Sequence, residues 1–482
     1  MGYSAQFQKL QTAVQTARGI QAGVNPGKVQ EVERAVASVL GELDQYPNLV
    51  RVHGHEEPLW IADRGDLTSQ AILALVALEQ VSPSENRRET IRKLATGLTY
   101  LQRKERMEYP FGAHISWKDD EPFAAFDDGT TAPTAYYRTD QAYAVEALAK
   151  AGQLLGESLF TQSAQREALG MATHLLVHGR LISSSSPQPQ YSNNPNDALA
   201  LTEGFVALYQ NTGSQLYSDL AALSTRWDSP GGEPTGARWQ ELKQIIEKSP
   251  SAEFLRAKPT GEPITFQYME AEDGKVVNKA IDVLKFRSSA GEDGTLAVMG
   301  RENTFWMRFD VPTEDDYLFD LSYLQSDVGG GLVSVMMRID GDKIFQVPLG
   351  DVDGKPILRR AYVDGPRPLR SGPHSFGIRF SGLLMTKPAL LDSVVVQPAV
   401  ERRAFTLPSG EILYVLHNVT GDEGRADKDH FESWPPVSQV VVDGEGAPAQ
   451  LGTSEDRRRR KEFVTLPPYG VALLKVRPGA NR

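Results

Sequence analysis

The residues best suited to proton transfer gather in one stretch of this sequence, from Tyr109 to Lys150. The stretch contains two adjacent aspartates in AFDDGTT, a histidine in FGAHISW and a further aspartate in YRTDQAY. Carboxylates and an imidazole within reach of a substrate can act as general acids and bases. The catalytic candidates from this stretch are Asp127, Asp128, Asp140 and His114.

Each of these candidates also has a purely structural explanation. Asp-Asp-Gly is a common turn sequence, and an aspartate at position 140 would be stabilised by the dipole of the helix that it opens. His114 could pack between its aromatic neighbours and donate to a backbone carbonyl. Glu203, in NPNDALALTEG, differs because it lies about two turns inside its helix, where capping no longer accounts for it. We therefore add an inward-facing Glu203 to the candidates.

Aromatic and polar side chains accompany these residues in the segments between apolar runs. Aromatic faces in an open cleft can hold pyranose rings, whereas each ring taken singly could be ordinary packing. We predict a substrate-binding rim that consists of Trp60, Trp117, Tyr136, Tyr137, Arg138, Tyr191 and Asn194.

Apolar residues at helical spacing indicate which elements must position these side chains. Helices are expected over 4–20, 27–44, 68–78, 83–103, 139–155, 163–178, 196–209, 214–225 and 237–248. They form hairpins with a short turn on one side and a longer, aromatic-rich segment on the other, the pattern of an α/α toroid. About eight or nine helices, against roughly twelve in a complete ring, predict that the toroid could be incomplete.

The period of the apolar residues changes from helical to alternating near Glu262, which indicates β-strands. We expect a multidomain protein, α then β: an N-terminal toroid over 1–255, a central β-sandwich or jelly roll over 262–400 and a small antiparallel β-domain over 401–482. The last of these is expected to brace the helical domain and receives no chemical role.

Composition limits the classes of partner and location. The 482 residues carry a formal charge of −11, which argues against binding to nucleic acid, and no apolar run is long enough to span a membrane. Cysteine is absent, which excludes disulfides and cysteine metal sites. The opening MGYSAQFQKL lacks the apolar run of a signal peptide. A cysteine-free, acidic chain of several modules suits an exported bacterial protein, so we expect a secreted or periplasmic location, with the signal peptide absent from this sequence.

Two parts of the sequence resemble known families. RTDQAYAVEALAKAGQLLGESLFTQSA and NPNDALALTEGFVALYQNTGSQLYSDLAA resemble the helical hairpins of α/α-toroid glycoside hydrolases and polysaccharide lyases. QYMEAEDG, FWMRFDVPTEDDYLFDLSY and LLDSVVVQP resemble carbohydrate-binding modules of the family 6 and family 35 type. The first resemblance concerns a fold pattern over about half of the chain.

These resemblances imply a carbohydrate-active enzyme that hydrolyses glycosidic bonds of an oligo- or polysaccharide with a pair of carboxylates. Asp127 or Asp128 would act together with Glu203 or Asp140. One alternative is a polysaccharide lyase, in which Arg138 or an asparagine at 193 or 194 neutralises a uronate and Tyr137, Tyr191 or His114 is the base. A second alternative is a glycan-binding protein without catalysis.

The family 6 and 35 resemblance also implies a structural calcium ion in the sandwich. Glu270 and Glu272 alternate along one expected strand and would share a face, and Asp392 lies in the last strand. Carboxylate oxygens are the ligands that calcium prefers, although the same residues could simply be exposed acids. We expect no organic cofactor.

Overall fold

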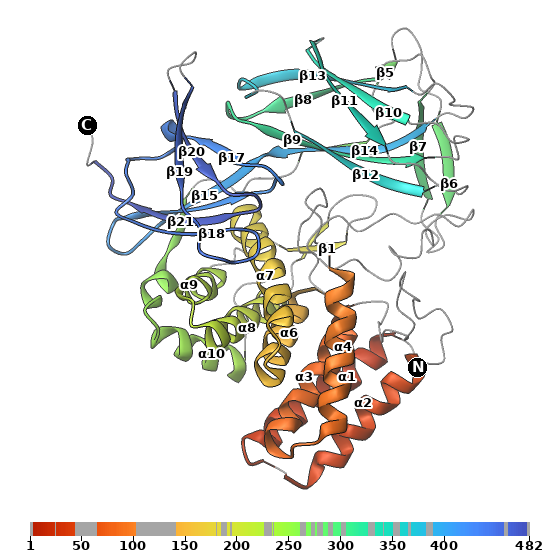
Figure 1. Cartoon of the computed structure of the whole chain (residues 1–482), viewed down its shortest axis with the longest axis vertical. Helices are drawn as coiled ribbons and strands as arrows, with labels where there is room; N and C mark the ends of the chain where they lie inside the picture. The colour runs from red at the N-terminus through yellow and green to blue at the C-terminus, as the bar shows by residue number, and fades with distance from the viewer. Residues whose placement is uncertain are drawn as a thin grey trace.

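The computed structural model describes a helical half and two antiparallel β-domains (Figure 1). The described residues are 3–24, 26–43, 65–102, 141–179, 181–184, 190–192, 195–225, 234, 236–260, 267–270, 275–276, 283–287, 293–299, 305–325, 333–340, 342–349, 357–364, 368–381, 389–456 and 461–479.

The helical half follows the expected hairpins closely. Its helices are α1 (Tyr3–Gln21), α2 (Val29–Leu43), α3 (Gly65–Val81), α4 (Glu85–Leu101), α6 (Ala142–Leu155), α7 (Ser158–His178), α8 (Pro195–Thr212), α9 (Gln215–Ser224) and α10 (Ala237–Glu247). One boundary was wrong: the helix expected over 163–178 begins at Ser158, because α6 ends at Leu155 and is capped by Gly156 with φ of 70°. Glycine adopts this left-handed conformation without strain, so the turn needs fewer residues than expected.

Alternate helices form one layer, because α1, α3, α6 and α8 contact each other in that order while α2, α4, α7 and α9 pack against them. Helices of the first set run in the same direction. Phe7 near the start of α1 contacts Tyr143 at the start of α6, and Arg18 near the end of α1 reaches Glu146 further along α6. These layer helices are rich in buried alanine and leucine, as expected of helices covered on most sides.

The connections differ in length on the two sides of this layer. Short segments follow α1, α3, α6 and α8, whereas the chain enters α3, α6, α8 and α10 from the long segments 44–64, 102–141, 179–194 and 225–236. Because the layer helices are parallel, their starts lie at one end, and the long segments that lead into α3, α6 and α8 attach there. This arrangement agrees with hairpins stacked side by side; closure into a toroid stays a prediction.

The central domain consists of two antiparallel sheets with the strand orders β11-β10-β13-β8-β5 and β12-β9-β14-β7-β6, with β4 also paired to β14. Its strands are β4 (Gln267–Glu270), β5 (Lys275–Val276), β6 (Val283–Arg287), β7 (Asp293–Met299), β8 (Phe305–Val311), β9 (Tyr317–Gln325), β10 (Val333–Ile339), β11 (Asp342–Leu349), β12 (Ile357–Asp364), β13 (Gly372–Ser381) and β14 (Ala389–Pro398). Antiparallel β-structure in this part of the chain is thus confirmed.

The last domain also has two sheets, β18-β21-β16-β15-β3 and β17-β20-β19. Its strands are β3 (Lys258–Thr260), β15 (Val400–Thr406), β16 (Ile412–Asn418), β17 (Gly424–Asp427), β18 (Ser438–Val442), β19 (Gly452–Asp456), β20 (Lys461–Leu466) and β21 (Val471–Val476). A separate hairpin, β1 (Ile182–Ser184) with β2 (Gln190–Tyr191), precedes α8. Since β3 pairs with β15, the central domain is inserted between two adjacent strands of the last domain.

The larger sheet of the last domain packs on the helices through a shared core (Figure 1). Alternation along β16 explains this packing: Leu413 and Val415 belong to the core that the helices share, whereas Tyr414 and Leu416 face the smaller sheet. The sheet therefore braces the helical half, chiefly at α7.

A small and mostly polar contact joins the central domain to the last one. Arg402 pairs with the buried Asp315, and the Ala399 amide donates to the Asp316 carbonyl at 2.8 Å. Leu318 and Val419 form an isolated apolar pair beside these groups. Charged groups thus set how the two β-domains meet.

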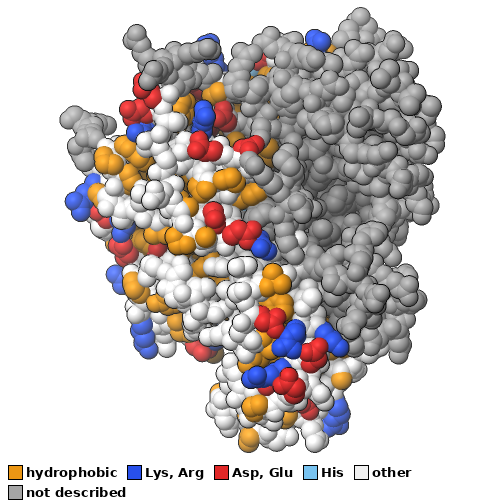
Figure 2. All heavy atoms as spheres, in the orientation of Figure 1, with side chains coloured by type: hydrophobic (Ala, Val, Ile, Leu, Met, Phe, Trp, Pro, Cys, Tyr) orange, Lys and Arg blue, Asp and Glu red, His pale blue; other side chains and the backbone are white. Residues whose placement is uncertain are grey.

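Acidic and basic side chains are interspersed over the described surface of the helices in Figure 2. None of the described helices has both the length and the apolar character needed to cross a lipid bilayer.

Candidate functional site

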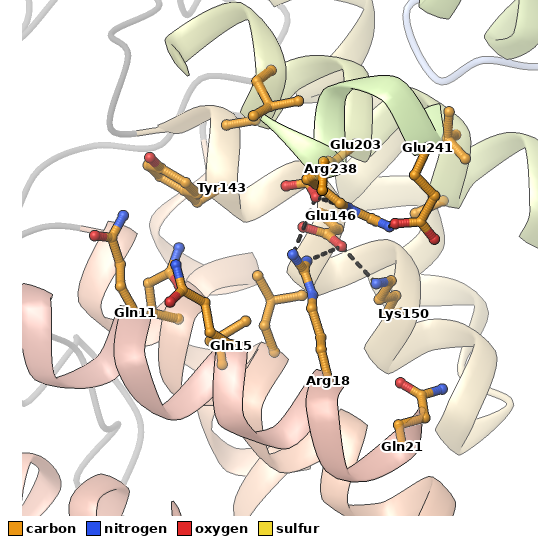
Figure 3. A pocket seen from close by; sticks show the side chains of 18 of the residues that line it. Gln11, Gln15, Arg18, Gln21, Tyr143, Glu146, Lys150, Glu203, Arg238 and Glu241 are labelled. Carbon is orange, nitrogen blue, oxygen red and sulfur yellow. Dashed lines mark hydrogen bonds and ion pairs between the residues drawn. The ribbon is translucent and has the colours of Figure 1, made fainter. Parts of the chain in front are cut away.

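A cavity of about 960 Å³ lies among α1, α3, α6, α8 and α10 (Figure 3). This volume is within the range that small-molecule sites occupy. Two glutamates project into it from neighbouring helices, Glu146 from α6 and Glu203 from α8. Both carboxylates are buried, with side-chain exposures of 2 % and 9 %. Buried acids in a cavity are candidates for function.

The two glutamates occupy equivalent places in successive hairpins. Each lies six residues after an aspartate, Asp140 before Glu146 and Asp197 before Glu203. The corresponding position after Asp66 in α3 is Ile72. Because the layer helices are parallel, this equivalence puts the two carboxylates at a similar depth.

Close packing of α6 on α8 brings these glutamates together. A Cβ on Gly204 would be 2.6 Å from Val145 Cγ1, so only glycine fits at this crossing. Gly204 directly follows one glutamate and Val145 directly precedes the other. The absence of a side chain at one position therefore sets the separation of the site's carboxylates.

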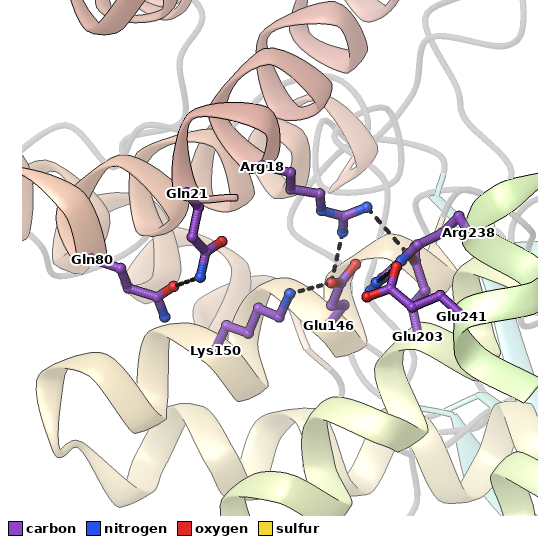
Figure 4. A network of polar contacts seen from close by, with 8 residues as sticks. All are labelled: Arg18, Gln21, Gln80, Glu146, Lys150, Glu203, Arg238 and Glu241. Atoms are coloured by element: carbon purple, nitrogen blue, oxygen red, sulfur yellow. Dashed lines mark hydrogen bonds and ion pairs between the residues drawn. The ribbon is translucent and has the colours of Figure 1, made fainter. Parts of the chain in front are cut away.

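Three cations hold the two carboxylates in a network (Figure 4). Arg18 of α1 bridges them, with 2.8 Å to Glu146 Oε1 and 3.1 Å to Glu203 Oε1. Lys150 Nζ is 2.6 Å from Glu146 Oε1, and Arg238 of α10 pairs with Glu203. Arg238 also reaches the exposed Glu241 at 2.8 Å. Both α1 and α10 are thus tied to α8 by ion pairs at Glu203.

The network separates the pKa values of the two acids. Burial opposes ionisation of Glu146, but Lys150 and Arg18 lower its pKa to about 2. Burial and the neighbouring Glu146 carboxylate raise the pKa of Glu203, although Arg18 and Arg238 act in the opposite direction. Acids whose environments drive their pKa values apart can divide the roles of proton donor and permanent anion.

The end of the cavity nearest the helix starts is lined by Tyr143, whose hydroxyl hydrogen-bonds to Gln11. Burial and the nearby carboxylates of Asp197 and Asp66 raise the pKa of Tyr143, so its hydroxyl stays protonated at neutral pH. Ser192 donates to the buried Asp197. Polar groups therefore continue from the glutamates towards the end where the long segments attach.

Of the predicted catalytic residues, Glu203 lies in the cavity, as its position along the helix indicates. The others lie outside the described residues: Asp127, Asp128, Asp140 and His114. The same holds for the predicted binding residues Trp60, Trp117, Tyr136, Tyr137, Arg138 and Asn194, while Tyr191 is placed only as the last residue of β2. Their roles stay predictions.

The expected calcium ligands are placed in part. Glu270 in β4 is opposite Ser393 in β14, and Ser393 directly follows Asp392, so the backbones of two expected ligands are neighbours. Asp392 lies where the β14–β9 register shifts, and Glu272 is outside the described residues. Within the part of the chain that the structure describes, no cluster of three or more acidic or histidine side chains has the arrangement of a metal site. Calcium binding stays a prediction.

Sequence reasoning missed Glu146, Arg18 and Arg238. The repeated Asp-to-Glu spacing in α6 and α8 could have indicated Glu146, because its equivalent was already a candidate. Arg18 carries no such local signal: its two partners are 128 and 185 residues away in sequence. Only the tertiary arrangement that places α1 across the cavity from Glu146 and Glu203 identifies it.

No family model and no curated protein sequence matches this chain. Solved structures with local similarity include an exo-β-1,3-galactanase from Phanerochaete chrysosporium, at 19 % identity over 29 % of this chain and 30 % of the galactanase, with a TM-score of 0.21. A family 35 carbohydrate-binding module from Clostridium thermocellum is 12 % identical over 28 % of this chain and 100 % of the module, with a TM-score of 0.22.

A further similar structure is a carbohydrate-binding module of the Cellvibrio mixtus lichenase 5A, at 16 % identity over 27 % of this chain and 95 % of that module, with a TM-score of 0.20. The neighbours are thus glycoside hydrolases and carbohydrate-binding modules, and the chain spans less than a third of the galactanase. TM-scores of this size do not establish a shared fold, so the functional assignment depends on the residues of this chain.

Proposed function

We propose that this chain is a carbohydrate-active enzyme whose helical half hydrolyses glycosidic bonds in the cavity between α6 and α8. The observation that carries the proposal is the pair Glu146 and Glu203, two buried carboxylates from equivalent positions whose pKa values are driven apart. Saccharide as the substrate class comes from the sequence resemblance of the central domain to family 6 and 35 modules.

Glycoside hydrolysis needs one carboxylic acid and one carboxylate around the bond that breaks. Glu203 would be the acid of the pair that takes up a proton and delivers it to the glycosidic oxygen, since burial and Glu146 raise the pKa of this acid. Glu146, ionised at neutral pH, would stabilise positive charge on the sugar ring or activate water. Arg18 touches both carboxylates and would position them relative to each other.

The ion pairs also have a structural effect. Loss of Glu146 or Glu203 leaves cations that are about a third exposed, so it should cost less than the roughly 3–5 kcal/mol of a pair that is buried on both sides. A Glu203→Gln or Glu146→Gln variant therefore needs a check of folding beside the activity. Circular dichroism during heating supplies that check for each variant.

The test incubates the protein with a panel of neutral and uronate polysaccharides. New reducing ends without ultraviolet absorbance mean hydrolysis, and reducing ends with absorbance from an unsaturated product mean elimination. Glu203→Gln and Glu146→Gln are expected to lower turnover about 10²- to 10⁴-fold. Glu89→Gln, which removes an exposed partner of Arg92 on α4, is the matched control and should retain activity.

The competing assignment takes the second catalytic carboxylate from the long segment before α6, where the sequence predicts Asp127 or Asp128 as the partner of Glu203. If Asp128→Asn abolishes turnover while Glu146→Gln retains it, the second carboxylate lies in that segment. Undiminished turnover in both glutamate variants would refute the cavity as the active site.

A further inference from the structure

Every cation among the described residues that line the cavity already has a carboxylate partner. Arg18 is shared by Glu146 and Glu203, Lys150 pairs with Glu146, and Arg238 pairs with Glu203 and Glu241. Before Glu203 takes up the proton that catalysis requires, these three positive groups are matched by three carboxylates, Glu146, Glu203 and Glu241. The described lining therefore offers no cation that a negatively charged ligand could bind without taking it from a protein carboxylate.

Taking a cation away would be costly because of where its partner lies. The cations are partly exposed, with side-chain exposures of 29 % for Arg18 and Lys150 and 33 % for Arg238, whereas both glutamate partners inside the cavity are buried. A ligand carboxylate that captured Arg18 would leave two buried carboxylates short of a counter-charge. Loss of one member of a buried pair is strongly unfavourable, since the remaining charge keeps its desolvation penalty.

The rest of the polar lining consists of neutral groups. Gln11, Gln15, Gln70 and Gln210 line the cavity from three helices, and Tyr143 adds a hydroxyl. Each side-chain amide carries two donors and an acceptor with two lone pairs, which suits the hydroxyls of an uncharged sugar. Aliphatic residues such as Val14 and Leu199 complete the wall and could cover the apolar faces of a ring.

We infer that the cavity selects neutral saccharides and discriminates against uronates. This inference rests on the proposed function for saccharide as the ligand class, and it adds which saccharides bind. The selection is electrostatic. The carboxylates of the lining repel an anionic sugar, and the cations that could attract it are already paired with those carboxylates. A neutral hexose carries a hydroxyl at the carbon where a uronate has its carboxylate, and this hydroxyl is not repelled by the carboxylates of the lining and can hydrogen-bond to the glutamine side chains.

The experiment compares sugars that differ only in whether the exocyclic carbon is an alcohol or a carboxylate. Galactotetraose and tetragalacturonate form one pair, and glucotetraose and tetraglucuronate the other. Binding is measured by isothermal titration calorimetry with the full chain at moderate salt. To restrict the measurement to this cavity, each titration is repeated with Gln210→Trp, which places a bulky indole at an exposed position of the lining and should obstruct ligand entry. We expect at least one neutral sugar to bind about tenfold or more tighter than its uronate, a difference that Gln210→Trp removes.

A second variant tests the physical cause. Glu241→Gln removes the exposed partner of Arg238, so its guanidinium regains donors for a ligand carboxylate. The uronate is expected to gain at least about threefold in affinity while the neutral sugar is unchanged. Glu89→Gln removes a similarly exposed acid that pairs with an arginine at i,i+3 spacing, far from the lining, and should alter neither affinity.

The outcomes separate the inference from the proposed function. Neutral selectivity without any hydrolysis would support the inference and refute the enzyme. Hydrolysis of uronate polymers, or equal binding of the paired sugars, would overturn the inference and leave the enzyme in place. Binding of neither sugar of either pair would overturn the inference as well, and so would an unchanged uronate affinity in Glu241→Gln.

Discussion

Lowering the pH is expected to weaken the contact between α7 and the larger sheet of the last domain, because buried histidines occupy it. His174 and His178 lie one turn apart on α7, with ring centroids 4.7 Å from each other, and His417 of β16 faces them. His178 Nε2 is 2.7 Å from Glu401 Oε1, and His417 Nδ1 is 2.8 Å from Thr173 Oγ1. Arg403 on β15 donates to the Leu176 carbonyl in the same contact at 3.1 Å.

The magnitude follows from the pKa of His417. Burial and the neighbouring His178 lower this pKa from 6.5 to about 4, against the effect of Glu401. Between these two values the unfolded chain binds a proton that the folded chain does not, so stability is complete above pH 6.5 and is lost as the pH falls towards 4. At about 1.4 kcal/mol per pH unit, His417 alone removes about 3 kcal/mol. His174 acts in the same direction, because burial, His178 and His417 lower its pKa well below the usual value.

Urea unfolding between pH 4 and 7, with amide hydrogen exchange of α7 and β16, measures the effect. His417→Gln should be less stable than the wild type at pH 7 but should lose less stability on acidification, since the amide gains no proton. His374→Gln is a control in which the pKa shift has the opposite sign. Burial lowers the pKa of His374, but hydrogen bonds to the Arg370 carbonyl and to Asp340 outweigh this effect and raise it. His374 therefore stabilises the fold most at low pH. Equal acid losses in the wild type and His417→Gln would refute the reasoning.

Two further substitutions test how packing and charge hold the molecule together. Gly204→Ala should destabilise the helical half by about 1–3 kcal/mol, because the new methyl group meets α6, and should lower cavity binding. Thermal melts measure this cost. The control is Gly41→Ala on α2, which should instead stabilise the protein by about 0.5–1 kcal/mol, because no atom lies within 4 Å of the new Cβ. Asp315→Ala leaves Arg402 without its buried partner and should cost about 3–5 kcal/mol and raise the mobility of the central domain in small-angle scattering. The control removes Glu31, the exposed partner of Lys28, and should cost less than about 1 kcal/mol. If Asp315→Ala costs equally little, the pair of Asp315 and Arg402 does not hold the two β-domains together.

Local patterns predicted the helices and the region of the larger β-sheets, but not the hairpin of β1 and β2 or the short strand β3. Helical spacing of apolar residues predicted α1 to α10 within a few residues at most ends, because burying one face is a property of neighbouring positions. The change to alternation near Glu262 predicted the β-domains for the same reason. Glu203 could be chosen as an inward acid because its distance from the helix start excludes capping.

The sequence by itself thus determined the helices, the change from helices to strands and one carboxylate of the candidate site. Tertiary structure alone decided that Glu203 has Glu146 beside it, that Arg18 joins them across 128 and 185 residues, and that β3 pairs with β15 around an inserted domain. The physical reason is that these contacts depend on close packing between distant segments, as at Gly204 against Val145, and a single residue carries no local pattern that specifies its partner.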